Sequence, residues 1–591
     1  MNHHTPDTTG TDTFPTDATG LSEAAPPETV ALADGDSIDL EIAPVAKRLG
    51  ETAVRMLGYN RSIPGPTLQV RQGSTVRVNV VNHGDLEATV HWHGLRLDNR
   101  YDGTHETQAP IPVGESFMYE IEFPDPGLYW YHPHIRQDYG QEMGLYGTII
   151  VTPEQPDYWP SGNREVVLTV DDILVENDQI TPFSRTEVTF SAMGRYGNVL
   201  LANGETDLSL QARAGEVIRF FLVNTANSRV FRITFPDARM KLVGGDSGRV
   251  EHERFVDDVT IAPSERAVVD VLFERAGEYV VEHRTPDDAY RLARVAVDEA
   301  SADPDLREAF QVLRSAPELE AERAAIAMYQ TAPPDKTLAL VAEMDMGSDV
   351  EIGTICACPM HSDIVASWAD RCPLCGMKVL PTESASRDLM TYVCPMHPEV
   401  TASWEASCPK CGMALRSQEG GHDDAETDHS DHPEHGHAHV HEPDHGHGDG
   451  IEWEDDMLEV NRTTTPANTR WKVVDRDTGA EGHGIEWTFR VGDRVKIRLV
   501  NEMDSDHPMH HPFHIHGAGR FLVLARDGRP EDNLVWKDTV LVRMSETVDI
   551  LLDVTHPGRW MAHCHIAEHH ESGMMFSFNV DPQAAHSVES K

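Results

Sequence analysis

Hydrophobic and polar positions alternate with a period of two along much of the chain, which is the pattern of β-strands with one buried face. Val76, Val78 and Val80 show it near the start, and residues 495–499 repeat it near the end, with turn-forming residues between such runs. Helical periodicity is scarce, and the one candidate helix lies near residues 305–329, which are rich in Glu, Ala, Leu and Arg. Residues 1–27 are rich in Thr, Asp, Pro and Gly, so a disordered tail is expected there. The pattern predicts an all-β protein from about residue 28 onward.

Two sequence elements recur three times at constant spacing and divide the chain into three related β domains. The first element runs from a Gly through a strand to an Asn, over residues 73–82, 215–224 and 492–501. The second runs from a Glu to a Gly that precedes another strand, over residues 115–127, 265–277 and 546–558. Short alternating strands in domains of this size predict Greek-key β-sandwiches. We place the domains at residues 28–158, at 159–300, and at 336–349 together with 450–585, with a linker over 301–335 that contains the candidate helix.

The chain of 591 residues is strongly acidic, because 98 Asp and Glu against 49 Lys and Arg give a formal net charge of -49. Nucleic-acid binding needs a basic footprint and anionic lipid attracts basic segments, so this charge argues against both. No apolar run approaches the roughly 18 residues that a membrane span requires. The first residues contain neither a basic segment nor an apolar stretch, so no signal peptide is visible. A cytoplasmic location is expected, with a periplasmic or extracellular one as the alternative.

The 33 histidines include four closely spaced groups at corresponding places in the first and third repeats. These groups are His91 with His93, His132 with His134, His511 with His514 and His516, and His563 with His565. On a strand, two histidines separated by one residue point to the same face, so two facing strands can hold several metal ions. A core or surface histidine without a ligand role explains most lone histidines, but not four such groups in matching positions. The middle repeat has Glu282 and Arg284 at the matching positions, so the metal cluster is expected between the first and third domains.

Cys564 lies apart from the other seven cysteines and is flanked by two of these histidines. One Cys, two His and a weak axial Met form a blue-copper electron-transfer set. The residues that supply such a set are Cys564, His511, His569 and Met574. The flanking histidines give a covalent path for electrons from this copper to the cluster, for which a zinc enzyme has no use.

With these motifs, the sequence resembles the three-domain multicopper oxidases of the laccase and copper-efflux-oxidase superfamily, over about residues 30–300 and 336–585 apart from an insert. The resemblance implies cupredoxin-like domains, four copper ions, and four one-electron oxidations coupled to the reduction of O2 to water. By this resemblance, a type 1 copper takes His511, Cys564 and His569, with Met574 axial. A type 2 copper takes His91 and His514. A type 3 pair takes the remaining histidines of the four groups, which are His93, His132, His134, His516, His563 and His565.

The same resemblance provides two candidates for proton delivery to O2. Asp102 matches a family Asp near the type 2 copper, although an Asp before Gly103 also fits an ordinary turn. Several bacterial members carry a relay Glu directly after the histidine that matches His569, and here His570 stands at that place. Glu571 follows it and is the substitute candidate. Cys564, as the point of electron entry, completes the predicted catalytic set.

An insert over residues 350–420 interrupts the third domain and contains a tandem repeat of 36 residues. Each copy offers three Cys and one His, which suits a closed tetrahedral metal site. The residues are Cys358, His361, Cys372 and Cys375 in the first copy, and Cys394, His397, Cys408 and Cys411 in the second. A structural zinc site is one interpretation; the Met residues in both copies favour Cu(I), which soft ligands select. Both copies resemble the heavy-metal-binding module of copper-efflux proteins, so additional Cu(I) or Zn is expected here.

Residues 421–449 alternate His with Asp, Glu and Gly, a composition that cannot form a packed core. We expect this tract to be disordered. Loose metal capture is its functional interpretation, because His-rich tracts commonly bind metal, and a solvated acidic linker is the alternative.

The leading functional prediction is a Cu(I) oxidase of copper tolerance that works as a monomer, with O2 and Cu(I) as its partners. The alternatives are a laccase-like phenol oxidase that takes phenolic electron donors, and a copper-sequestering protein with an inactive oxidase core. A copper nitrite reductase is disfavoured because His563 and His565 flank Cys564 on both sides, as a trinuclear cluster requires.

Overall fold

The computed structural model describes residues 13–344, 354–361, 363–368, 371–374, 377–382, 389–417, 449–502 and 505–583. The predicted His-rich tract lies outside the described residues up to residue 448, as do residues 1–12 of the predicted disordered tail. For residues 13–27 the prediction of disorder is wrong. Phe14 is buried and stacks on Tyr139 at 3.8 Å between ring centroids, and the Ala24 amide donates to the Ala46 carbonyl. The segment is held because an aromatic anchor and backbone hydrogen bonds outweigh its polar composition.

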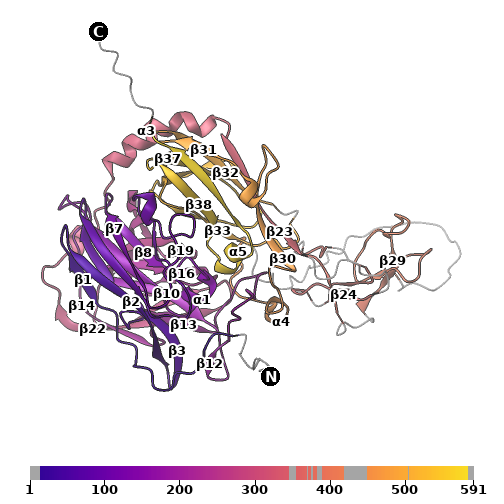
Figure 1. Ribbon diagram of the computed structural model, residues 1–591, viewed down its shortest axis with the longest axis horizontal. Helices are drawn as coiled ribbons and strands as arrows, with labels where there is room; N and C mark the ends of the chain where they lie inside the picture. Colours follow the sequence, from indigo (N-terminus) through magenta and orange to yellow (C-terminus); the bar gives the residue numbers. More distant parts are fainter. Residues whose placement is uncertain are drawn as a thin grey trace, which may run out of the picture.

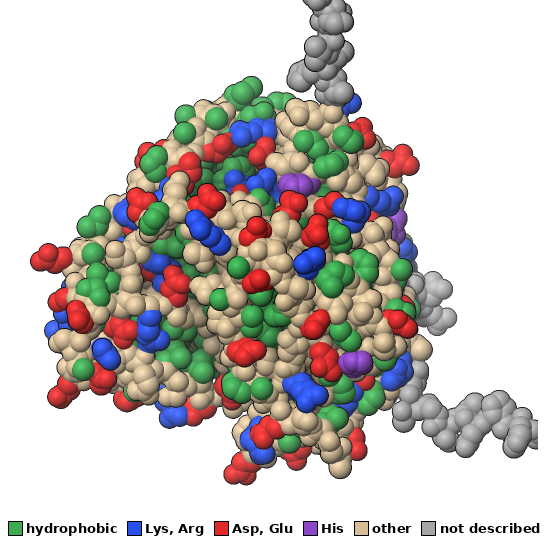
Figure 2. Space-filling view, turned by 60° about the vertical axis from the view of Figure 1, so that its left-hand side comes forward, with side chains coloured by type: hydrophobic (Ala, Val, Ile, Leu, Met, Phe, Trp, Pro, Cys, Tyr) green, Lys and Arg blue, Asp and Glu red, His purple; other side chains and the backbone are tan. Residues whose placement is uncertain are grey.

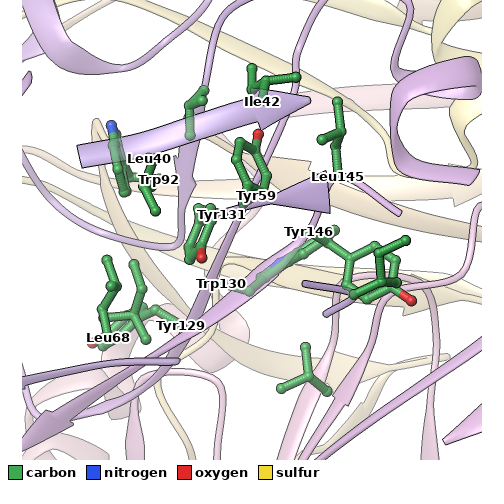
Figure 3. Close-up of a cluster of buried hydrophobic side chains, with 14 of the residues drawn as sticks. Leu40, Ile42, Tyr59, Leu68, Trp92, Tyr129, Trp130, Tyr131, Leu145 and Tyr146 are labelled. Atoms are coloured by element: carbon green, nitrogen blue, oxygen red, sulfur yellow. The ribbon is translucent and has the colours of Figure 1, made fainter. Parts of the chain in front are cut away.

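The first domain packs two sheets face to face. In spatial order, one sheet contains β1 (Thr29–Leu32), β4 (Thr67–Arg71), β9 (Gly147–Thr152), β8 (Gly127–His132) and β6 (His91–His93), and the other contains β3 (Thr52–Tyr59), β2 (Ser37–Leu49), β5 (Thr75–Asn82) and β7 (Ser116–Glu122). Figure 3 shows part of the core between them, where the ring of Tyr131 lies 5.1 Å from that of Tyr59 and 5.8 Å from that of Trp92. Trp92 points into this core, so its neighbours His91 and His93 face the opposite side.

The middle domain has the same construction. One sheet contains β13 (Val199–Ala202), β10 (Arg164–Ile173), β15 (Glu216–Asn224), β20 (Arg266–Phe273), β17 (Arg239–Gly245) and β18 (Gly248–Val256), and the other contains β14 (Leu208–Ala214), β22 (Ala289–Ser301), β21 (Gly277–Arg284), β16 (Phe231–Thr234) and β19 (Asp258–Ile261). A small hairpin joins β11 (Val175–Glu176) to β12 (Gln179–Ile180). This domain has its own core of buried aliphatic and aromatic residues.

The third domain lies above the other two in Figure 1. One sheet contains β30 (Thr469–Asp475), β23 (Lys336–Met344), β32 (Arg494–Asn501), β37 (Thr547–Val554), β34 (Gly519–Arg526) and β35 (Arg529–Pro530), and the other contains β31 (Thr488–Arg490), β39 (Met575–Asp581), β38 (Gly558–Cys564), β33 (His511–Ile515) and β36 (Thr539–Val542). The prediction of an all-β fold with three cupredoxin-like sandwiches is confirmed.

Helices are few among the residues that the structure describes. They are α1 (Gln137–Glu142), α2 (Arg307–Phe310), α3 (Pro317–Thr331), α4 (Leu458–Asn461) and α5 (Ala567–Glu571), with 3-10 turns η1 (Asn99–Tyr101) and η3 (Gly482–Gly484). The linker predicted as one helix near 305–329 is therefore two. The second starts with Pro317, which has no amide to donate and suits the first turn of a helix. Within the described residues, no helix has both the length and the apolar character needed to cross a membrane.

The repeated Gly and Asn have the same structural role in each domain. The side-chain amide of each Asn donates to two backbone carbonyls: Asn82 to Leu86 and Ile111, Asn224 to Arg229 and Ile261, and Asn501 to Met509 and Arg543. The repeated glycines all adopt positive φ, from 81° at Gly73 to 154° at Gly127, which favours glycine. In each sandwich, the repeated Gly residues therefore form turns, and the repeated Asn holds two loop segments together by hydrogen bonds.

The described parts of the insert project from the third domain, at the right of Figure 1. Its short strands form a single sheet in the order β26 (Leu380–Pro381), β24 (Cys356–Ala357), β25 (Val365–Ala366), β28 (Thr401–Ala402), β27 (Tyr392–Val393) and β29 (Arg416–Ser417). The two copies of the repeat pair through β25 and β28 with reciprocal bonds, because the Ser367 amide donates to the Thr401 carbonyl and the Ser403 amide to the Val365 carbonyl. They form a pseudosymmetric pair.

Acidic and basic side chains are interspersed over the face in Figure 2, with small apolar areas between them. Many of the arginines pair with carboxylates, including partly buried pairs such as Arg55 with Asp85 and Arg498 with Asp549. The excess of acidic residues is therefore spread over the molecule and forms no single patch on this face.

Candidate copper centre

Eight imidazoles from the first and third domains meet where the two domains touch. We call them the histidine cluster: His91, His93, His132, His134, His514, His516, His563 and His565. The contact crosses the domain boundary, because the ring of His91 lies 4.0 Å from that of His516, and the ring of His93 lies 3.8 Å from that of His514. All eight are at least 98 % buried. The structure thus brings together the histidines predicted to hold the type 2 and type 3 coppers.

Strand pairing places these side chains. β6 pairs with β8, with His91 opposite His132, and β33 pairs with β38, with His514 opposite His563. In each domain, the residues that alternate with the histidines point into the sandwich core, as Trp92 does in β6. Because side chains alternate along a strand, histidines separated by one residue place their imidazoles on the same face of the sheet.

Hydrogen bonds define which nitrogen of each ring faces inward. A backbone carbonyl can only accept, so Nδ1 carries the proton in His91, His132, His514 and His563, which bond to the carbonyls of Asp102, Pro133, Asp538 and Cys564. His516 donates its Nδ1 proton to the Asp102 carboxylate at 2.9 Å. Their Nε2 atoms are left as lone-pair donors that point toward one another.

The inward nitrogen atoms have the positions and the free lone pairs expected of metal ligands. The Nε2 atoms of His516 and His563 face each other at 3.0 Å, and burial lowers the pKa of both rings well below the usual value, so neither carries a proton there. Two lone pairs at this distance repel unless a cation lies between or beside them. In addition, His91 Nε2, His93 Nδ1, His132 Nε2, His514 Nε2 and His565 Nε2 are buried without a hydrogen-bond partner. Buried polar atoms are normally paired, so these atoms are the expected copper ligands.

The blue-copper set lies on the third domain alone. Cys564 Sγ is 3.6 Å from His511 Nδ1 and 3.8 Å from His569 Nδ1, and all three residues are buried together with Met574. His569 donates its Nε2 proton to the Ala192 carbonyl of the middle domain at 3.2 Å, which leaves Nδ1 unprotonated toward the sulfur. Burial raises the pKa of the Cys564 thiol, so the thiolate forms on binding a metal.

Asp102, the first candidate for proton delivery, is fully buried between the two halves of the cluster. Its carboxylate accepts from His516, while its backbone carbonyl accepts from His91 at 2.7 Å. Its second carboxylate oxygen, Oδ1, makes no hydrogen bond and lies 3.4 Å from His91 Nδ1. The following Gly103 has φ +79°, and a Cβ there would lie 1.9 Å from the Val90 carbonyl oxygen, so only glycine allows this close approach.

Glu571, the second candidate, lies one step away from the cluster. It accepts from the Gln137 amide at 3.2 Å and lies 3.8 Å from His570 Nδ1. Burial and the nearby Asp138 raise the pKa of Glu571 to about 8. The ring that packs on the cluster is that of His570, at 4.6 Å from His563. Glu571 is therefore connected to the histidine cluster through His570.

Several residues of the site carry no signal in the sequence. Asp538 accepts from His93 Nε2 at 2.9 Å through its side chain, and Trp471 stacks on His569 at 3.9 Å. His507 Nε2 lies 3.0 Å from the sulfur of Met193, next to the blue-copper set. None of these shows a repeated spacing, and only the position of Asp538 directly before a strand of the third domain offered a hint.

The insert holds two further groups of potential metal ligands. In the second copy, Cys394, His397, Cys408 and Cys411 bring their ligand atoms within 4.8 Å of one another, and in the first copy Cys358, His361 and Cys372 do the same. Cys375 lies outside the described residues. Although desolvation raises it, the amide hydrogens of Lys410 and Cys411 lower the pKa of the Cys408 thiol to about 6. A lowered thiol pKa favours the thiolate that a metal requires.

The first copy of the insert docks on the segment that leads to His511. Arg371 Nη2 donates to Asp506 Oδ1 at 2.7 Å, and Lys378 Nζ donates to the Met344 carbonyl at 2.8 Å. Met377 is buried in the core of the third domain, and Met360 packs against it. The matching residues of the second copy, Met413 and Met396, are 39 % and 67 % exposed.

Comparisons with known proteins agree with this construction. Multicopper oxidase sequence profiles match residues 43–156, 155–297 and 454–584, and a heavy metal binding domain profile matches residues 357–382 and 391–417. The chain is 29% identical over 293 residues to multicopper oxidase MmcO of Mycobacterium tuberculosis, covering 44% of this chain and 56% of that protein. It is 26% identical over 282 residues to copper resistance protein A of Escherichia coli, covering 39% and 46%. The chain thus spans about half the length of the curated relatives it matches.

Solved structures share the fold over nearly the whole chain. A multi-copper oxidase from Pseudomonas thermotolerans aligns with a TM-score of 0.57 at 21% identity, covering 93% of this chain and 100% of that one. A Campylobacter jejuni multicopper oxidase described as a metallo-oxidase aligns with a TM-score of 0.58 at 17% identity, covering 96% and 98%. The profile matches to all three sandwiches and to both copies of the insert place this chain in the multicopper oxidase family, with heavy-metal-binding modules inserted in its third domain.

Proposed function

We propose that the chain is an oxidase that holds four coppers at the histidine cluster and the blue-copper set, and that it oxidises Cu(I) to Cu(II) at the expense of O2. When bound, the coppers supply one-electron acceptance at one site and reduction of O2 to water at the other. The protein supplies neutral imidazoles in defined tautomers, a buried environment, and the backbone of residues 563–565, which joins the two ligand sets.

One observation carries the choice of Cu(I) as the electron donor: the first copy of the insert rests on the segment 505–511. Arg371 and Lys378 bind Asp506 of this segment, Met377 belongs to the same hydrophobic core as Met193 and Met509, and Met360 packs against that core. Soft sulfur ligands select Cu(I). A metal held by the first copy would therefore be attached to the chain segment that leads to His511 of the blue-copper set.

Burial of the blue-copper set supports the same choice. His511 is 1% exposed and His569 is fully buried, so a phenol ring has no direct contact with either imidazole. The similarity to copper resistance protein A of Escherichia coli agrees with a role in copper tolerance. An efficient phenol oxidase would need an open approach to these rings, so phenols are expected to be slow electron donors here.

Paired variants of the two insert copies test this proposal. Cys358→Ser with Cys372→Ser removes the docked site, and Cys394→Ser with Cys408→Ser is the matched change in the distal copy. The docked-site variant should lose about tenfold or more of kcat/KM for Cu(I), measured as O2 uptake, because loss of a ligand set lowers metal affinity. Oxidation of a small phenol should be unchanged. Equal loss of both activities, or of neither, would contradict delivery through the insert.

Cys564→Ser separates an oxidase from a sequestering protein. The variant should bind copper in the cluster and insert but lose the blue absorbance and O2 uptake. If the wild-type chain, fully loaded with copper, consumes no O2 with Cu(I) or phenols, sequestration is its function.

A further inference from the structure

The middle domain supplies no ligand to the histidine cluster, yet one of its side chains reaches the cluster's edge. Arg266, at the start of β20, is fully buried. Its two terminal nitrogens donate to the carboxylate of Asp538 in the third domain, Nη1 to Oδ1 at 2.7 Å and Nη2 to Oδ2 at 2.5 Å. Its Nε donates to the Leu128 carbonyl of the first domain at 3.0 Å. A single guanidinium therefore bonds to both domains that build the cluster. Bidentate charged pairs of this kind fix geometry as well as charge.

Asp538 passes this constraint to two histidines. Its carboxylate Oδ1 accepts the Nε2 proton of His93 at 2.9 Å, and its backbone carbonyl accepts the Nδ1 proton of His514 at 2.9 Å. His93 belongs to the first domain and His514 to the third. The rings are stacked 3.8 Å apart, so Asp538 positions a pair of imidazoles that meet across the domain boundary.

His93 needs such a partner because its ring is turned the other way from its neighbours. Its unpartnered inward atom is Nδ1, whereas His91, His132, His514 and His565 present Nε2. To present a lone pair at Nδ1, the ring must keep its proton on Nε2, and the Asp538 carboxylate accepts a bond from that proton. Carboxylates that bond to a metal-binding histidine set both its tautomer and its orientation.

The backbone around His93 is shaped to admit the ion pair. Gly94 has φ +84°, and a Cβ there would lie 2.5 Å from Asp538 Oδ2 and 2.8 Å from Arg266 Nη2. Any other residue would push the pair away from the strand. The close approach of the Arg266–Asp538 pair therefore explains why position 94 is a glycine.

We propose that Arg266 is a positioning residue for copper binding, acting through Asp538 to hold His93 with Nδ1 toward the cluster and His514 beside it. The domain without ligands then takes part in the copper site. This inference rests on the proposed copper binding by the cluster and is independent of the identity of the electron donor.

Arg266→Gln tests the proposal, with Arg219→Gln as a matched control. Arg219 also makes a buried two-point pair in the middle domain, with Asp270 at 2.9 and 3.1 Å, and it has no contact with the histidine cluster. Both variants lose a buried ion pair, so both should lower the urea midpoint of the copper-free chain. Only Arg266→Gln should weaken copper binding, by about 10- to 100-fold for the copper held by the cluster, as is usual when the partner of a ligand is lost.

Three measurements complete the design. Copper affinity is measured by titration of the copper-free chain against a chelator, copper per chain by elemental analysis, and the blue absorbance serves as an internal reference for the intact third domain. In an Asp538→Asn background, Arg266→Gln should add little further loss of affinity, because the arginine acts through that carboxylate.

The outcomes are distinct. Copper affinity lost in Arg266→Gln, kept in Arg219→Gln and not lowered further in the double variant supports the proposal. Equal copper affinity in Arg266→Gln and wild type, or equal losses in both arginine variants, overturns it. A wild-type chain that binds no copper at the cluster would instead contradict the proposed function.

Discussion

At the residue scale, the site is defined by where each imidazole keeps its proton. Backbone carbonyls hold the Nδ1 proton of four cluster histidines, and two carboxylates, Asp102 and Asp538, hold one proton each of His516 and His93. The histidines that form the cluster were predictable from their spacing and from the resemblance to multicopper oxidases. Their partners were not, because Asp538 is 445 positions from His93 and no local pattern connects them.

The axial position of the blue-copper set can be tested with one substitution. Met574 is fully buried beside Cys564. Met574→Leu removes a weak ligand, so the reduction potential should rise, by roughly 59 mV or more, which is a tenfold change in the equilibrium constant of a one-electron couple. Redox titration of the blue absorbance measures this, and an unchanged or lower potential would show that Met574 does not act as the axial ligand.

In the middle domain, His283 occupies the position that Cys564 occupies in the third domain, and its protonation can be tested. Both lie six residues after the repeated Gly, and His283 is buried, with Nδ1 accepting the Arg232 amide at 3.1 Å. Burial, and then the charge of Arg229, lower the pKa of His283 to about 3.

Because the folded pKa is below the unfolded one, the contribution of His283 to stability is present above pH 6.5 and is lost as the pH falls toward 3, at about 1.4 kcal/mol per pH unit. His283→Phe removes this dependence. Between pH 6.5 and 5, the wild-type chain should lose about 2 kcal/mol more unfolding free energy than the variant, measured by urea titration of the copper-free proteins. Parallel losses would show that His283 is not held neutral.

At the element scale, the strands could be predicted from the sequence, whereas the segments that connect them could be predicted only in part. The alternating patterns and the repeated Gly–Asn and Glu–Gly elements located strands in all three sandwiches. The linker was predicted as one helix, but Pro317 starts a second helix, α3, which contacts β18 and β34. The order of residues 13–27 was missed because the anchor is a single residue, Phe14, that binds to a distant surface.

The turn after η1 positions Asp102, and its role can be tested by a substitution at Gly103. Gly103→Ala adds a Cβ at 1.9 Å from the Val90 carbonyl oxygen, in a backbone region that disfavours alanine. The backbone must shift and carry Asp102 with it, so stability should fall by about 1–3 kcal/mol or more. Activity should fall further than stability predicts.

Gly114→Ala is the control for this turn, since Gly114 also has positive φ but no atom within 4 Å of the added Cβ. Thermal unfolding and O2 uptake of both variants are compared. If Gly114→Ala reduces O2 uptake as much as Gly103→Ala does, the position of Asp102 is not the cause.

At the scale of the whole molecule, the three domains depend on one another. The cluster is shared between the first and third, His569 bonds to the middle domain, and Arg266 bonds to both others. Three related sandwiches and a cluster between the first and third were predictable from the repeat, whereas the part played by the middle domain was not. Its Glu282 and Arg284 indicated only that ligands are absent there.

Copper removal should loosen the contact between the first and third domains, because unprotonated Nε2 atoms then face each other at 3.0 Å. With free copper at about 100 times the dissociation constant, loading should add about 2.7 kcal/mol to the unfolding free energy. Amide hydrogen exchange should slow in β6 and β33 on loading. Exchange in the core of the middle domain, for example in β15, is the internal control. Equal slowing in β6 and β15 would indicate a general effect of copper.

The pairing of β23 with β30 has a consequence for how the insert was acquired. The two strands are antiparallel neighbours, with Met344 opposite Thr469, so the polypeptide leaves the sandwich and returns at almost the same point. The tandem modules therefore extend a hairpin connection of the third domain, while Ile451 and Trp453 of the returning chain pack back onto the sandwiches. Such a junction keeps both sheet strands in place when the modules are exchanged, provided that a new module also fills the position of Met377 in the core of the third domain. Evolution, or an engineer, could therefore replace the tandem modules with a cassette of different metal preference and leave the O2-reducing machinery intact.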